Sequence, residues 1–179
     1  AEAHNNKGAL LQELGKFDEA MEALNKSISL KADYADAYNN IGLTLQSKDK
    51  FDEAIVALNK SISLKADYPD AYNNIGLTLQ SKNKFDEANE TYKNAINQFP
   101  ESHQLYHSFA ISLIKQNQTK LAIEKFHQAL ELDPQNPNYN SDLGEMYRRI
   151  KKLDLSIEFN LRSVKISPES DNAHYNLGL

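Results

Sequence analysis

The sequence of 179 residues predicts an all-α protein, a solenoid built from helix–turn–helix repeats. Three observations predict this fold class. Residues 35–54 and 69–88 agree at eighteen of twenty positions, which sets a period of 34 residues. Apolar residues within each period recur at helical spacing in two segments. Glycine and proline return at fixed positions of the period, which chance does not produce.

The period divides the chain into five repeats and a partial sixth, which we interpret as one array over residues 1–179. The repeats cover residues 1–34, 35–68, 69–102, 103–136 and 137–170, and the partial first helix covers residues 171–179. Five of the six glycines stand at position 8 of a repeat, and all five prolines stand at position 1 or 32. The chain begins with Ala1 rather than Met, so we expect it to be an excerpt of a longer protein.

The first helix of each repeat places positions 4, 7, 8 and 11 on one face. In the second repeat these are Tyr38, Ile41, Gly42 and Leu45. Position 15 is expected to end this helix. Four of the five residues there are Gly, Asp or Asn, which accept the left-handed conformation at a helix end, and the fifth is Lys151.

The second helix of each repeat places positions 17, 20, 21, 24, 27 and 28 on one face. Positions 8, 20 and 27 hold almost only Gly, Ala or Ser, which lets the crossing helices approach closely. Proline at position 32 suits a break after the helix. One helix pair cannot bury its own apolar face, so we expect neighbouring repeats to stack.

These residue types resemble the tetratricopeptide repeat, and the resemblance covers essentially the whole chain. The third repeat carries the pattern most fully, in Tyr72, Ile75, Gly76, Leu79, Ala88, Tyr92, Ala95 and Pro100. The fifth repeat departs most, with Ser156 at position 20 and Asn160 at position 24. The resemblance implies a right-handed superhelix whose first helices line a concave groove for an extended peptide or a partner helix.

The candidate binding residues lie on the first-helix face away from the predicted core, at positions 5, 6 and 9. They are Asn6, Asn40, Asn74, Asn5, Asn39, Asn73, Leu43, Leu77, Ser108 and Ile111. An Asn amide matches the donor and acceptor groups of an extended backbone, and position 9 adds an apolar floor. The alternative is that these amides bond between adjacent helices and hold the stack together.

The position-6 column resembles the Asn ladder in the superhelix of O-linked N-acetylglucosamine transferases. It also resembles the Asn part of the carboxylate clamp of heat-shock-protein co-chaperones. That clamp needs basic residues at positions that include position 2, where the first three repeats have Glu2, Asp36 and Asp70. The acidic residues there would repel a C-terminal carboxylate, so we do not expect this clamp.

Several other classes of protein and site are disfavoured. The net charge of −5 argues against nucleic acid as a partner, and no apolar run reaches the roughly 18 residues of a membrane span. With no cysteine, disulfides and thiolate metal sites are excluded. His103 and His107 are spaced to share a metal, but two ligands are half a site. We expect no catalytic residue, metal or cofactor in this segment.

The leading functional hypothesis is therefore a non-catalytic scaffold that binds a protein or peptide in its groove. One alternative is the substrate-recruiting module of a larger transferase, such as a peptide-modifying glycosyltransferase, with catalysis outside these residues. Another is self-association through the ends of the array, where the partial sixth repeat leaves apolar surface.

Overall fold

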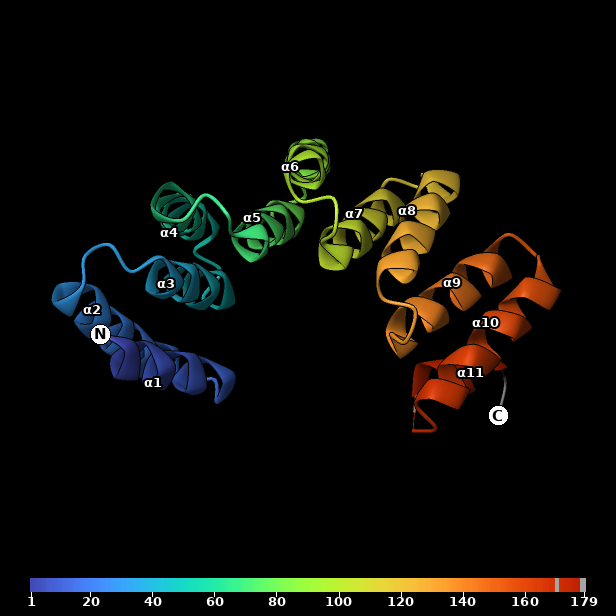
Figure 1. Ribbon diagram of the computed structural model, residues 1–179, viewed down its shortest axis with the longest axis horizontal. Coiled ribbons are helices and arrows are strands. Elements are labelled where there is room, and N and C mark those ends of the chain that lie inside the picture. The colour runs from blue at the N-terminus through green and yellow to red at the C-terminus, as the bar shows by residue number, and fades with distance from the viewer. Residues whose placement is uncertain (170, 178–179) are drawn as a thin grey trace. The chain divides into compact units, whose positions relative to one another are not determined.

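In the computed structural model, the described residues, 1–169 and 171–177, form helices and no strand, which confirms the all-α prediction (Figure 1). Residues 178–179 of the partial sixth repeat lie outside the described residues. The helices are α1 (Glu2–Glu13), α2 (Phe17–Leu30), α3 (Ala35–Ser47), α4 (Phe51–Leu64), α5 (Pro69–Ser81), α6 (Phe85–Gln98), α7 (His103–Lys115), α8 (Thr119–Leu132), α9 (Pro137–Arg149), α10 (Leu153–Ile166) and α11 (Asp171–Leu177).

The chain divides into two compact units, Ala1–Thr91 and Tyr92–Leu179, called here the N-terminal and C-terminal units, with the boundary inside α6. In the N-terminal unit α1 packs on α2 and α3 packs on α4, while α3 also contacts both α1 and α5. Figure 1 shows α1, α3 and α5 on one side of this unit, with α2 and α4 on the other. The first helices of successive repeats therefore form a common face.

The first helix of each of the five complete repeats ends at position 13, and position 15 makes the left-handed turn after it, where the sequence predicts this conformation. All five residues there have a positive φ, from 57° at Asp49 to 72° at Gly15. The backbone N–H of position 16 bonds to the carbonyl of position 11, as from Lys50 to Leu45 at 2.9 Å. The N–H of position 15 bonds to position 12, which completes a Schellman motif. Lys151 adopts this conformation with φ of 60° although lysine does not favour it.

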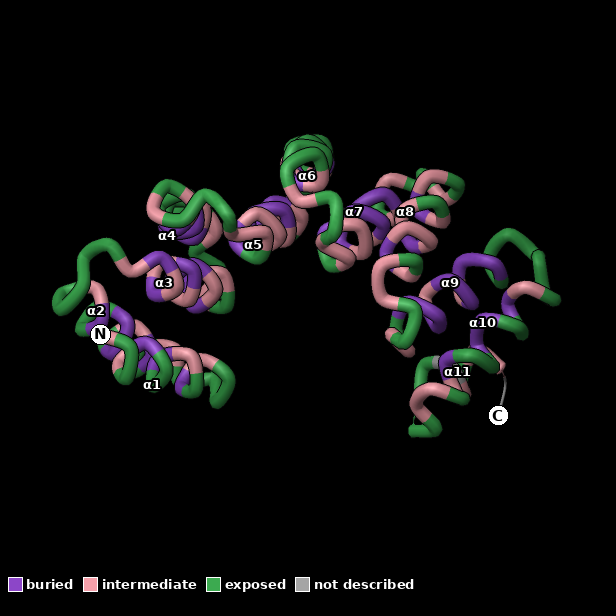
Figure 2. The backbone as a smooth tube through the Cα atoms, in the orientation of Figure 1, coloured by how far each residue is buried: buried purple, intermediate pink, exposed green. Residues whose placement is uncertain are grey.

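Small side chains allow the two helices of a repeat to cross closely. A Cβ atom added at Gly42 would lie 2.6 Å from Cγ of Leu58, which is fully buried. Ala54 at position 20 is also fully buried. Figure 2 shows buried residues on α3 and α4 where these two helices face each other.

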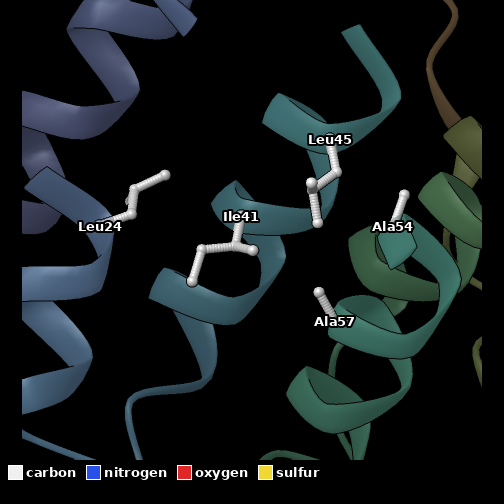
Figure 3. Close-up of a cluster of buried hydrophobic side chains, with 5 residues drawn as sticks. All are labelled: Leu24, Ile41, Leu45, Ala54 and Ala57. Carbon is white, nitrogen blue, oxygen red and sulfur yellow. The ribbon is translucent and has the colours of Figure 1, made fainter. Parts of the chain in front are cut away.

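Neighbouring repeats share a core. In the cluster of Figure 3, Leu24 comes from α2, Ile41 and Leu45 from α3, and Ala54 and Ala57 from α4. The cluster thus joins the second helix of the first repeat to both helices of the second. This is the stacking that the repeat pattern predicts, because one pair alone leaves its apolar face open.

Serine at position 27 does more than keep the crossing small. The hydroxyl of Ser61 donates to the carbonyl oxygen of Ala35 at 2.8 Å, and Ser27 and Ser163 donate in the same way to Ala1 and Pro137. Each bond ties the last turns of a second helix to the residue at position 1 of its own repeat. Position 27 is Ser in the first, second and fifth repeats and Ala in the third and fourth, and the Ser residues were the signal for this bond in the sequence.

The C-terminal unit repeats this pairing, with α7 on α8, α9 on α10, and α11 against both α9 and α10. Its packing departs from the pattern at Asn160, which is fully buried where other repeats have Leu, Tyr or Phe. The Asn160 amide donates to the Ser156 carbonyl at 2.8 Å and accepts from Asn176 Nδ2 at 3.2 Å. The buried polar side chain is therefore satisfied within the unit.

Candidate functional site

The amide side chains at positions 5 and 6 of the N-terminal unit bond to each other between repeats. Asn40 Nδ2 donates to Asn5 Oδ1 at 2.9 Å, and Asn74 Nδ2 donates to Asn39 Oδ1 at the same distance. The acceptors Asn5 and Asn39 are each 6% exposed, so they are part of the packed interface between first helices. This is the stack-holding role that the sequence allowed as the alternative to ligand contact.

The same register recurs in the C-terminal unit with different chemistry. His107 at position 5 faces Asp142 at position 6 of the following repeat, with Nε2 and Oδ2 2.7 Å apart. Asn176 at position 6 reaches the backbone oxygen of Ser141 at position 5, at 3.4 Å. Each contact joins residues 35 apart, one repeat plus one residue. Position 5 with the next position 6 is thus a recurring inter-repeat contact.

The position-6 amides keep unused polar groups. Asn40 and Asn74 are half-buried, and within the described residues neither side-chain oxygen has a hydrogen-bond partner. Asn6 is exposed and accepts from Asn5 Nδ2 at 3.4 Å. Asn73 is half-buried, and its Oδ1 atom is buried without a partner in the described part of the chain.

A groove on the first-helix face of the N-terminal unit crosses α1, α3 and α5 and has a volume of about 640 Å³. It is lined by Leu43 at position 9, Gln12 and Gln46 at position 12, Ser47 and Ser81 at position 13, Asp49 in the turn and Phe51 at the start of α4. The amides of Gln12 and Gln46 are half-buried, and no hydrogen bond to another described residue occupies them. The groove therefore combines two apolar side chains, Leu43 and Phe51, with two free amides and the carboxylate of Asp49.

The remaining predicted residues lie apart from this groove lining. Leu77 is half-buried on α5, and Ile111 is half-buried on α7. Ser108 on α7 is 8% exposed and belongs to the packed interior. In the fifth repeat, position 9 is Glu145, which forms ion pairs with Arg148 and Arg149, so the apolar column is interrupted there.

Acidic groups flank the N-terminal first helices. The carboxylate of Asp36 at position 2 accepts a hydrogen bond from the Tyr68 hydroxyl. Burial of this hydroxyl, together with the negative charge of Asp36, raises the pKa of Tyr68 well above its usual value. Lys65 lies 4.3 Å from the centre of the Tyr68 ring. Glu2 and Asp70 are exposed at the same position of their repeats. A carboxylate approaching this edge of the face meets like charge.

The two histidines with metal-ligand spacing both contact side chains of α9. His103 Nδ1 lies 2.7 Å from the Tyr139 hydroxyl, and His107 pairs with Asp142 while stacking on Tyr139 at 4.7 Å between ring centres. Among residues 1–169 and 171–177, no group of three or more His, Asp or Glu side chains is placed to hold a metal ion. In the same part of the chain, no helix is long and apolar enough to span a bilayer.

The chain belongs to the tetratricopeptide repeat family. A family model described as "TPR repeat" matches residues 8–49, 46–82 and 112–151, and one described as "Tetratricopeptide repeat" matches residues 69–102. The helix pairs, the small residues at the crossings and the 34-residue register are those of this family. The chain is accordingly a TPR protein–protein interaction domain, and neither matching model describes an enzyme.

Solved structures with the same fold share little sequence with the chain. The structure of YrrB, described as "a TPR protein with an unusual peptide-binding site", is 19% identical, with a TM-score of 0.67 over 98% of this chain and 91% of YrrB. MamA from Desulfovibrio magneticus RS-1 is 18% identical, with a TM-score of 0.72 over 95% and 96% of the two chains.

PilF from Pseudomonas aeruginosa is also 18% identical, with a TM-score of 0.75 over 98% of this chain and 87% of PilF. None of the curated protein sequences compared matches the chain. At these identities the likeness establishes the fold.

Proposed function

We propose that the N-terminal unit binds an extended peptide segment of a partner protein along the face formed by α1, α3 and α5. The observation that carries the proposal is the groove of about 640 Å³ in which Leu43 lies with the free amides of Gln12 and Gln46. Its volume falls in the range of about 300–1,000 Å³ that is typical of ligand sites.

The chemistry of this face suits a peptide backbone. Each side-chain amide offers two N–H donors and one oxygen acceptor, and a net hydrogen bond contributes about 1 kcal/mol. The unused oxygens of Asn40 and Asn74 extend the set of polar groups along α3 and α5. Leu43 gives one apolar contact for a ligand side chain. We expect neutral or basic segments to bind better than acidic ones, because Asp36 and Asp70 lie on the same helices.

The experiment is a selection of peptides from a random library on the full chain, followed by affinity measurements with two variants. Leu43→Asp places a charge in the groove, whereas Val56→Asp places the same charge on α4, at a side chain that is 70% exposed. Selected peptides should lose about tenfold or more in affinity for Leu43→Asp, because a charge replaces an apolar contact. Their affinity for Val56→Asp should stay within twofold.

Two results would contradict the proposal. Selected peptides that bind Leu43→Asp as tightly as the unmodified chain would place the ligand elsewhere. A library that yields no binder would contradict the proposal that the chain binds peptides. If these residues are the substrate-recruiting module of a larger transferase, the same groove would bind its peptide substrates. Leu43→Asp and Val56→Asp would then test substrate binding in the same way.

A second candidate function, self-association, rests on one stripe of α10. Leu153, Ile157 and Leu161 follow one another at four-residue spacing and are 59%, 51% and 53% exposed. A second copy of the chain could cover this apolar surface. Light scattering over a concentration range should show a mass that rises with concentration, and Ile157→Glu should abolish the rise. A constant monomer mass would exclude this function.

A further inference from the structure

A second pocket lies in the C-terminal unit. It has a volume of about 570 Å³ and is formed by α8, the turn after it, α9 and α10. Its apolar walls include Leu130, Pro134 and Ile166. Asn140 of α9, which is 2% exposed, also lines it.

The pocket arises where the repeat loses an aromatic side chain. Position 4 is Tyr38, Tyr72 and Tyr106 in the second to fourth repeats, and Asn140 in the fifth. In the N-terminal unit, Tyr38 and Ile28 of the preceding repeat each pack against the shared core. Leu130 is the counterpart of Ile28 in the fourth repeat. Asn140 is smaller than the tyrosine of the earlier repeats, and together with Leu130 it lines a pocket.

Neighbouring side chains do not replace the missing ring. Tyr139, one residue earlier, turns to α7, where it stacks on His107 and bonds to His103. The Asn140 amide folds back and donates to the carbonyl of Asn136 at 2.9 Å. Asn136 itself stands at position 34, where the first two repeats have tyrosines. Two aromatic positions of the pattern are therefore polar at this junction.

The rim of the pocket is cationic. Arg162 and Lys165 line it, and no carboxylate is among the lining residues. Arg162 pairs with Glu158 at 2.6 Å, so its charge is partly used. Lys165 is exposed and forms no ion pair with another described residue. A ligand group beside Lys165 is therefore favoured if it is anionic.

We propose that this pocket binds a peptide segment in which an aromatic side chain is flanked by acidic residues. The ring occupies the space that tyrosine fills in the earlier repeats, and a neighbouring carboxylate pairs with Lys165. An aromatic ring buries a large apolar area and anchors a peptide in a pocket of this kind. The chemistry is opposite to that of the N-terminal groove, whose acidic flank disfavours such a segment.

The test uses short blocked peptides and nuclear magnetic resonance of the full chain. Acetyl-Glu-Phe-Glu-amide should produce saturable shifts of backbone amides in residues 130–140 and 162–166. Acetyl-Glu-Ala-Glu-amide, which lacks the ring, should bind about tenfold or more weakly. Acetyl-Lys-Phe-Lys-amide, which has the ring but the opposite charge, should also bind more weakly.

Variants of the protein locate the site. Asn140→Tyr restores the residue of the earlier repeats and should weaken binding of acetyl-Glu-Phe-Glu-amide about tenfold or more. Lys165→Gln should weaken it about threefold, the size of one exposed ion pair. Lys60→Gln is the control, because it makes the same substitution in α4 at a junction that has Tyr38. Lys60 stands at the repeat position of Arg162. The affinity of the Lys60→Gln variant for acetyl-Glu-Phe-Glu-amide should not change.

Several outcomes would overturn the proposal. Equal binding of the phenylalanine and alanine peptides would show that the ring does not enter the pocket. Equal binding of the acidic and basic peptides would show that Lys165 does not pair with a carboxylate of the ligand. Should Asn140→Tyr fail to fold, as judged by circular dichroism, the three peptides and the Lys165→Gln variant still decide. Shifts confined to residues outside 130–140 and 162–166 would place the site elsewhere.

Discussion

The amide pair of Asn39 and Asn74 gives a quantitative test of the inter-repeat contact. Asn74→Ala removes the donor and leaves Asn39 Oδ1, in a residue only 6% exposed, without its 2.9 Å partner. A buried acceptor left unpaired costs about 1–3 kcal/mol. Asn39→Ala removes the acceptor, but the half-buried Asn74 amide can then reach water, so we expect a smaller cost of about 1 kcal/mol.

The assay is a double-mutant cycle measured by urea unfolding of the full chain. The two substitutions together should cost less than the sum of the single ones, with a coupling free energy of about 1 kcal/mol. The higher helix propensity of Ala cancels in the cycle. Asn59→Ala, at an exposed position of α4, is the control and should change the free energy of unfolding by less than about 0.5 kcal/mol. A coupling energy of zero within error would refute the contact.

Three further substitutions test the fold, each by the same urea unfolding measurement. Gly42→Leu should lower the free energy of unfolding by about 1–3 kcal/mol, because its Cβ would lie 2.6 Å from Leu58 Cγ; an unchanged value would contradict the close crossing. Lys151→Gly should raise the free energy of unfolding by about 0.5–1 kcal/mol, because glycine adopts the positive φ without strain. Lys152→Gly, at a φ of −92°, should not raise it. Equal effects of the two substitutions would refute the strain at Lys151. Ser61→Ala should lower the free energy of unfolding by about 0.5–1.5 kcal/mol by breaking the bond to the Ala35 carbonyl, and no loss would show that this bond contributes nothing.

The fold could be predicted from the sequence because its determinants are local and recur. The turn at position 15 follows from Gly15, Asp49 and two Asn residues, and the register alone extends it to Lys151, whose own preference opposes it. The close crossing follows from the small residues at positions 8 and 20. These features need no knowledge of what lies across the interface.

The partners of the site amides could be predicted only as alternatives. Position 5 bonds to position 6 of the next repeat, 35 residues away, and the hydrophobic period does not specify which polar groups meet. One signal was present. Where position 5 changes to His107, the following position 6 changes to Asp142, so the pair changes together. Whether the remaining polar groups contact a ligand stays a prediction.

The pocket at Asn140 illustrates a second limit. The sequence shows that tyrosine is replaced at position 4, but a replacement of this kind can be accommodated by collapse of its neighbours or can leave a space. Here Tyr139 turns toward His107 instead of into the gap, so the space remains. That outcome depends on side-chain directions in three helices, which repeat spacing does not determine.

The most direct test of peptide binding by the N-terminal unit is to map a library-selected peptide on the chain by backbone amide shifts. We predict that the shifts center on Gln12, Leu43 and Gln46, in helices α1 and α3. Shifts centered instead on α4 around Val56, with those three amides unmoved, would contradict it.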